Sequence, residues 1–219
     1  PSSSPATSSR SAGALAALRE GYRLLPNEPE AASALGVALL ATGDAAGAEK
    51  YLARARDLDP GSSARHGNLG TLYFLLGRVP DAIGEYDASA RIAPNDAKAH
   101  ADLGTALLAS GDFRRAELEL GKAIAQEPKR ASFKNNLGYA FQSRGKLGAA
   151  RAEYDAALAI DPKLASAWIN LATLLAKSPA TRGDARKALL KAQALDATDP
   201  RVKANLEELD ALEKGHATP

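Results

Sequence analysis

The sequence predicts an all-α fold in which one two-helix module is repeated along the chain. Proline recurs at a step of 34 residues without a slip, at Pro26, Pro60, Pro94, Pro128 and Pro162. A leucine followed by glycine or alanine keeps the same step, at 35–36, 69–70, 103–104, 137–138 and 171–172. A fixed helical period of this length is typical of a solenoid, in which each module packs only on its neighbours.

Each module is predicted to read helix, turn, helix, turn. The first helix ends at a glycine midway through the module, because glycine enters the left-handed C-terminal cap without a Cβ penalty; these are Gly43, Gly77, Gly111 and Gly145. The periodic proline ends the second helix, since it lacks an N–H and clashes inside a helix. An alanine row, opposed to the glycine of each Leu-Gly pair, is expected to let the two helices approach closely; it comprises Ala14, Ala48, Ala82, Ala116 and Ala150.

The two ends of the chain differ from the repeats. Residues 1–11 predict a disordered tether, because six serines and two prolines leave almost nothing to bury. Residues 12–28 align with second helices only and predict half a repeat. Five full repeats are expected over 29–199, and Asp199 with Pro200 predicts the start of a capping helix over 200–214, followed by a tail over 215–219.

The repeat resembles the tetratricopeptide repeat family when each unit is counted from Pro29, Ser63, Ala97, Ala131 and Ala165. The Leu-Gly pair then falls at positions seven and eight, alanine at twenty and proline at thirty-two. The resemblance implies a right-handed α-solenoid that binds proteins without catalysing a reaction. Position four departs from the family pattern, which favours a bulky apolar residue there. Trp168 fits that pattern, whereas Ala32, His66, His100 and Lys134 do not. The fifth unit departs as well, with residues 178–184 in place of the glycine turn.

Composition excludes several classes of function. The net charge is only +2 with both signs interspersed, so the basic footprint of a nucleic-acid-binding protein is missing. The chain has no cysteine, hence no thiolate metal site, and no apolar run long enough to span a membrane. No catalytic motif is found, so we expect no enzyme, no catalytic residues and no cofactor.

His66 and His100 are candidate metal ligands, because they occupy the same place in successive repeats. A metal pair is one interpretation of this spacing. A part-buried polar ridge is the other, and it is favoured because no third ligand keeps the register. We therefore expect no metal site.

The family register assigns a concave groove to positions two, five, six, nine, twelve and thirteen of the first helices. The candidate partner-binding residues are Asn68, Thr71, Phe74, Lys98, Asp102, Thr105, Asn135, Asn136, Tyr139, Gln142, Asn170 and Thr173. Asn68, Asn136 and Asn170 share position six, so their amides either form a ladder for the backbone of an extended peptide or reflect the family consensus. The rings of Phe74 and Tyr139 are stronger candidates, because an aromatic ring in an open groove favours a covering partner.

The ligand is predicted to be a protein or peptide segment, and two settings stay open. The Ser/Pro-rich start resembles the spacer of bacterial envelope lipoproteins, and the repeats resemble lipoproteins that act as pilotins in type IV pilus assembly. That resemblance implies a secretin subunit as partner, a lipid anchor upstream of Pro1, and a place in the periplasm or at the inner leaflet of the outer membrane. The alternative is a generic adaptor of the cytoplasm or periplasm. The encoded sequence before Pro1 discriminates between them.

Overall fold

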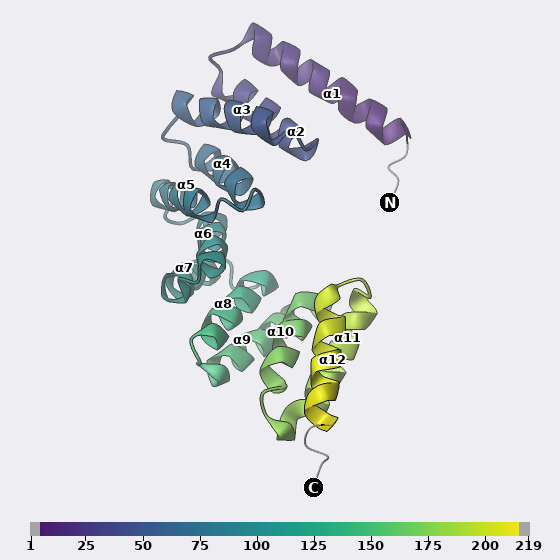
Figure 1. Ribbon diagram of the computed structural model, residues 1–219. Helices are drawn as coiled ribbons and strands as arrows, with labels where there is room; N and C mark the ends of the chain where they lie inside the picture. Colours follow the sequence, from purple (N-terminus) through teal and green to yellow (C-terminus); the bar gives the residue numbers. More distant parts are fainter. Residues whose placement is uncertain (1–4, 215–219) are drawn as a thin grey trace. The chain divides into compact units, whose positions relative to one another are not determined.

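The computed structural model describes the backbone of residues 5–214 and the side chains of residues 13–214. This part of the chain consists of helices joined by short turns (Figure 1). The α-helices are α1 (Pro5–Leu24), α2 (Pro29–Ala41), α3 (Ala45–Leu58), α4 (Ser63–Leu75), α5 (Val79–Ile92), α6 (Ala97–Ser110), α7 (Phe113–Gln126), α8 (Ala131–Ser143), α9 (Leu147–Ile160), α10 (Ala165–Leu175), α11 (Arg182–Leu195) and α12 (Pro200–Lys214). The predicted fold class, an all-α right-handed solenoid, is confirmed.

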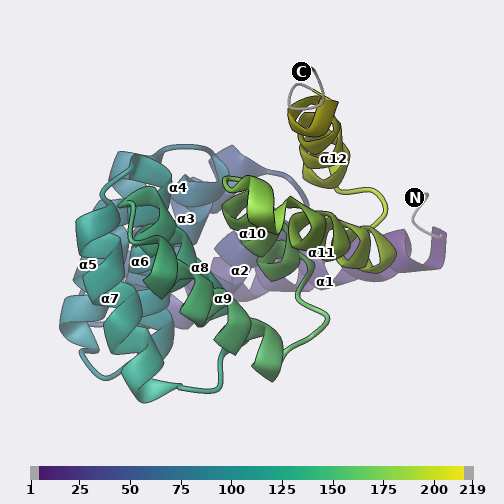
Figure 2. The same ribbon diagram turned by 90° about the horizontal axis from the view of Figure 1, so that it is seen from below.

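The chain divides into two compact units, Pro1–Ser110 and Gly111–Pro219. The boundary falls at the turn between α6 and α7, so the two helices of the third repeat belong to different units. Within the units, consecutive helices pair as the repeat requires: α2 with α3, α4 with α5, α8 with α9, and α10 with α11. The last of these pairs lies side by side in both views (Figure 1 and Figure 2).

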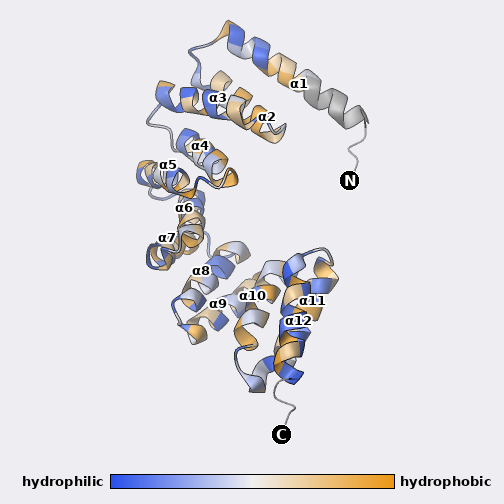
Figure 3. Cartoon of the chain, in the orientation of Figure 1, coloured by the Kyte–Doolittle hydropathy of each residue, from blue (hydrophilic) through white to orange (hydrophobic). Residues whose placement is uncertain are grey.

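The core of the first unit lies between its amphipathic helices, which carry hydrophobic and hydrophilic residues on different faces (Figure 3). Leu35, Leu39, Leu52 and Leu69 are buried there, and Leu18 of α1 packs against them. Helix α1 begins at Pro5, which differs from the tether expected over 1–11, because proline is tolerated at the first position of a helix. Residues 1–4 lie outside the described residues.

The core of the second unit is built mainly from α9, α10 and α11. Tyr154, Leu171 and Leu189 are buried in it. Helix α12 closes this core with Val202 and Leu209, which are 2% and 1% exposed. Its range, Pro200–Lys214, is the one expected for the capping helix, and the predicted tail over 215–219 lies outside the described residues.

The four turn glycines adopt the left-handed conformation that the sequence predicts for them. Their φ angles are 85° at Gly43, 72° at Gly77, 82° at Gly111 and 76° at Gly145. No other residue type in the described part of the chain has a positive φ. Each first helix of the four intact repeats therefore stops where glycine alone avoids the clash of Cβ with the backbone.

The glycines of the Leu-Gly pairs face a different partner from the alanine row that the sequence predicts. A Cβ added to Gly70 would lie 2.8 Å from the ring of Tyr86, and one added to Gly138 would lie 2.6 Å from the ring of Tyr154. These glycines thus make room for the large side chain at position twenty-four, and the alanine row contributes less than predicted. In the second unit only the carbonyl oxygen of Ala150, 3.2 Å from the added Cβ, belongs to that row.

Candidate functional site

A groove of about 510 Å³ runs across the first helices of the second unit. All six residues predicted for this unit line it: Asn135, Asn136, Tyr139, Gln142, Asn170 and Thr173. Four further residues complete the lining, namely Ser166, Ile169, Arg201 and Asn205. The groove therefore extends over α8 and α10 onto α12, so that the capping helix is part of the candidate site.

Carboxamide side chains link the helices that form this groove. The amide Nδ2 of Asn170 donates to Oδ1 of Asn135 at 2.9 Å, and Nδ2 of Asn135 donates to Oδ1 of Asn136 at 3.3 Å. Asn135 is only 6% exposed, so these bonds satisfy an amide that would otherwise be costly to bury. Asn205 of α12 donates to the hydroxyl of Thr173 at 3.1 Å. The row of amides is thus held in place before any ligand arrives.

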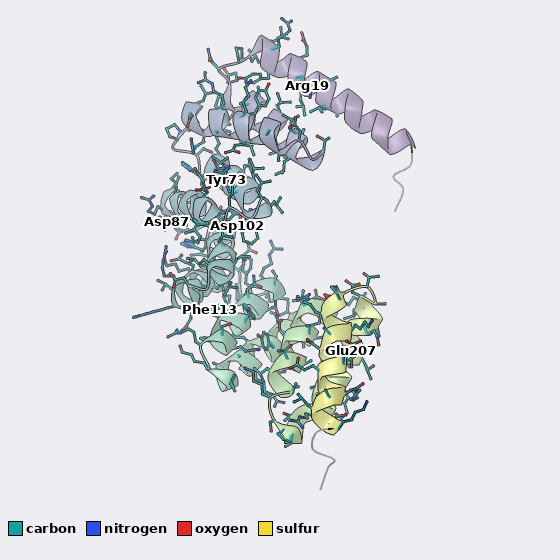
Figure 4. All side chains as sticks on the ribbon, in the orientation of Figure 1. Arg19, Tyr73, Asp87, Asp102, Phe113 and Glu207 are labelled. Carbon is teal, nitrogen blue, oxygen red and sulfur yellow. The ribbon has the colours of Figure 1, made fainter. Side chains whose placement is uncertain are left out.

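Gln142 and Tyr139 of the groove are each held by an aromatic neighbour. Gln142 accepts a hydrogen bond of 3.0 Å from the hydroxyl of Tyr154, a buried residue. Burial raises the pKa of Tyr154, which therefore stays neutral and remains a donor. The ring of Tyr139 is 41% exposed and meets Phe113 edge to face at 6.3 Å; Phe113 is labelled at the start of α7 in Figure 4.

Arg201 and Asn205 were missed by the sequence reasoning, although a signal for them exists. When the one-residue insertion of the fifth unit is carried forward, counting from Pro200 places Asn205 at position six and Arg201 at position two. Asn205 therefore belongs to the same row as Asn136 and Asn170. The guanidinium of Arg201 is held by Asp199, with Nη2 2.6 Å from Oδ2.

The first unit brings together fewer of its predicted residues. Asn68, Lys98 and Asp102 line a hollow of about 330 Å³ with Ser63, Ala64, Gly67, Ser89, Ala93, Asp96 and Ala99. Lys98 and Asp102, the latter labelled in Figure 4, form an ion pair of 2.5 Å one helical turn apart. Thr71, Phe74 and Thr105 do not line this hollow.

Position nine has a local structural role in several repeats. The hydroxyls of Thr71, Thr105 and Thr173 each donate to the backbone carbonyl four residues earlier, at 2.9, 2.8 and 3.0 Å. At position six, Asn68 donates to the hydroxyl of Ser33 on the preceding first helix at 3.1 Å. The same arrangement joins Asn170 to Asn135, so asparagine at this position bridges neighbouring first helices in both units.

The three residues at position four that carry a ring nitrogen, His66, His100 and Trp168, share one structural role. Ring nitrogens of His66, His100 and Trp168 lie 3.1, 2.9 and 2.9 Å from the carbonyl oxygens of Pro60, Pro94 and Pro162. The other ring nitrogen of His66 is 2.6 Å from Glu85. These side chains tie each first helix to the proline turn before it. In the described part of the chain, no group of three or more His, Cys, Asp or Glu residues could hold a metal ion.

Among residues 5–214, no helix combines the length and the apolar character needed to cross a bilayer.

A stack of two-helix modules with a groove on its first helices defines an α-solenoid repeat protein. Models of the tetratricopeptide repeat match residues 8–69, 39–101 and 101–165. The chain belongs to the tetratricopeptide repeat family, whose members mediate protein–protein interactions and typically serve as scaffolds without catalytic activity. No curated protein matches the sequence.

Several solved structures are similar in fold. The Cut9–Hcn1 hetero-tetramer of the APC/C matches with a TM-score of 0.78 at 17% identity. The match covers 92% of this chain but only 40% of the length of the matched chain. The structure of pilF from Pseudomonas aeruginosa matches with a TM-score of 0.76 at 17% identity. The match covers 92% of this chain and 91% of the pilF chain. YrrB, described as a protein with an unusual peptide-binding site, matches with a TM-score of 0.68 at 17% identity, covering 87% and 98%. These likenesses establish the fold alone.

Proposed function

We propose that this chain is a non-catalytic scaffold that binds an extended segment of a partner protein in the groove of its second unit. One observation carries the proposal: each of α8, α10 and α12 contributes side chains to the groove that donate and accept hydrogen bonds. A carboxamide offers both donors and an acceptor, which is what the backbone of an extended peptide requires.

The amides of the groove keep hydrogen-bonding capacity for a ligand. The bond from Asn170 to Asn135 uses one of the two N–H groups of Asn170. Its second N–H and its Oδ1 are available to a peptide lying along the groove. Tyr139, with its ring partly exposed beside these amides, supplies apolar contact area for a side chain of the same peptide.

The charge of the groove favours recognition of backbone over recognition of charged side chains. Arg201 is the only charged residue of the lining, and its guanidinium is already paired with Asp199. Binding there should depend only weakly on salt, because few unpaired charges are brought together.

Combined replacement of Asn136 and Tyr139 by alanine tests this site. Peptides selected from a displayed random library on the full chain serve as probes, and their affinity is measured by fluorescence anisotropy. The double variant should bind at least about tenfold more weakly, because a central aromatic anchor and a backbone contact are lost together. Arg151→Ala on α9 should bind as the wild type does, and neither variant should change the helical circular-dichroism spectrum. Full-strength binding by the double variant would contradict the proposal.

A finer form of the proposal places the chain among pilotin-like lipoproteins of type IV pilus assembly, with a secretin subunit as the partner. It is supported by the resemblance of the Ser/Pro-rich start to the spacer of bacterial envelope lipoproteins and by the likeness in fold to pilF. In size and in Ala/Arg-rich character the chain also resembles Tgl, a gliding-motility lipoprotein of myxobacteria. The alternative, an adaptor in another complex, is favoured by the likeness in fold to proteins as different as Cut9 and YrrB.

Fractionation of the full-length natural product separates these two settings. The lipoprotein proposal expects the protein in the outer-membrane fraction, and its release when a cysteine directly before Pro1 is replaced by serine. Loss of the anchored form should also reduce the amount of secretin multimer in the same membranes. Recovery of the unaltered full-length protein in the soluble fraction would contradict the lipoprotein proposal and favour the adaptor.

A further inference from the structure

A second candidate surface lies on α7, away from the groove. It consists of Arg114, Arg115, Glu117, Leu118, Gly121, Lys122 and Ala125 on α7 and Arg144 at the end of the neighbouring α8, and it encloses a shallow hollow of about 740 Å³. We refer to these residues as the α7 surface. Leu118 is 59% exposed in the middle of a helix whose opposite face is buried, and it adjoins the small residues Gly121 and Ala125, so the exposed apolar area is continuous.

The apolar part of this surface is a strip with room above it. Leu118, Gly121 and Ala125 are spaced three and four residues apart and so share one side of α7. A Cβ added to Gly121 would meet nothing within 4 Å. In the corresponding second helices α5 and α9, the place of Gly121 is taken by Asp87 and Asp155. Neither of these two second helices therefore repeats the apolar strip of α7.

The charged part of the surface is cationic. The lining holds four basic side chains, Arg114, Arg115, Lys122 and Arg144, and one carboxylate, Glu117. Just outside it, Glu119 pairs with Lys122 at 3.0 Å and Asp112 lies 3.9 Å from Arg115, so the positive charges still outnumber the negative ones. Glu117 accepts hydrogen bonds from Arg144 and from Lys146, the latter at 2.9 Å. Partial burial alone would raise the pKa of Glu117, but these bonds lower it, so the carboxylate stays ionised and its charge is compensated. Arg114 has no ion-pair partner among residues 13–214.

We propose that the α7 surface docks an acidic amphipathic helix of a partner protein. An apolar ridge of that helix lies over Leu118, Gly121 and Ala125, where the small residues leave space for it. Carboxylates flanking the ridge meet Arg114, Arg115 and Lys122, so that the charges of the two surfaces are complementary. A hollow with one large apolar side chain suits an inserted ridge better than a lipid surface, into which several apolar side chains would have to protrude.

The proposal is tested on the full chain with three labelled peptides of about 18 residues, a length that gives several helical turns. The first carries a Leu/Ala stripe at helical spacing with glutamate elsewhere. The second has the same composition with the stripe scrambled, and the third has lysine in place of glutamate. We expect the first to bind at least about tenfold more tightly than the other two, and to weaken severalfold between about 0.05 M and about 0.3 M NaCl.

Two matched variants locate the binding. Leu118→Glu should weaken the first peptide at least about tenfold. Leu190 of α11 is 52% exposed, so Leu190→Glu introduces the same charge at a similar surface position. It should change the affinity for the first peptide little. The groove variant with Asn136→Ala and Tyr139→Ala should bind this peptide as the wild type does, which keeps the test independent of the groove.

Three results would overturn the proposal. Equal affinity for the three peptides would remove both the apolar and the charge complementarity. Equal losses in Leu118→Glu and Leu190→Glu, or a loss in the groove variant, would place the peptide elsewhere. Binding to phosphatidylglycerol vesicles that Leu118→Glu abolishes, without binding of the acidic peptide, would assign the surface to a membrane.

Discussion

Replacement of Tyr154 by alanine is expected to lower the free energy of unfolding of the second unit by roughly 3–5 kcal/mol, the range for truncating a large buried aromatic side chain. Tyr154 is fully buried among the residues of α9, α10 and α11, where closely packed neighbours leave the vacated space unfilled. The change also leaves the side-chain oxygen of Gln142 without its donor.

Urea denaturation followed by tryptophan fluorescence measures the stability of the second unit. Trp168 is the only tryptophan of the chain and packs against the same core, so its emission reports on the second unit. Tyr139→Ala is the matched control, because its ring is 41% exposed and its main contact is one edge-to-face pair, worth about 0.5–1.5 kcal/mol. Similar urea midpoints for the two variants would show that Tyr154 is not the central residue of this core.

The second large effect is expected for Gly138→Leu, which should destabilise the same unit by about 1–3 kcal/mol or somewhat more. The first added carbon would already lie 2.6 Å from the ring of Tyr154 and 3.2 Å from the carbonyl of Ala150. Both neighbours belong to the well-packed crossing of α8 and α9, so the backbones have to separate.

Gly148→Leu provides the control, since a Cβ at Gly148 meets nothing within 4 Å and leucine favours the helix more than glycine does. We expect it to leave the urea midpoint unchanged or to raise it slightly. Combining Gly138→Leu with Tyr154→Ala should cost less than the sum of the two changes, because the leucine enters space that the ring has left. Strict additivity would mean that the two side chains do not meet.

The division into helices and turns could be predicted from the sequence because it depends on the backbone chemistry of single residues. A proline removes its own N–H, and a glycine relaxes its own φ, so Pro128 and Gly145 end their helices whatever lies around them. Repetition at a step of 34 residues then extended the prediction from one module to all. The lining of the groove in the second unit followed from the same register, which placed Asn136, Tyr139 and Asn170 together.

What the sequence left open concerns contacts between residues far apart in the chain. The register made Asn135 and Asn170 equal candidates for the groove, but only the structure shows that Asn135 is buried and that the two amides bond to each other between α8 and α10. For His66 the sequence favoured a part-buried polar role, but only the structure shows its partners, which are Glu85 and the carbonyl oxygen of Pro60.

By itself, then, the sequence determined the period, the helix ends and the face of each helix, since these follow from local steric rules and from helical spacing. Only the tertiary structure decided that Gly138 faces the ring of Tyr154, that Asn205 of α12 extends the groove, and that α7 exposes Leu118 among basic side chains. The physical reason is that burial and hydrogen bonding between helices depend on how closely the helices pack, which no single residue encodes.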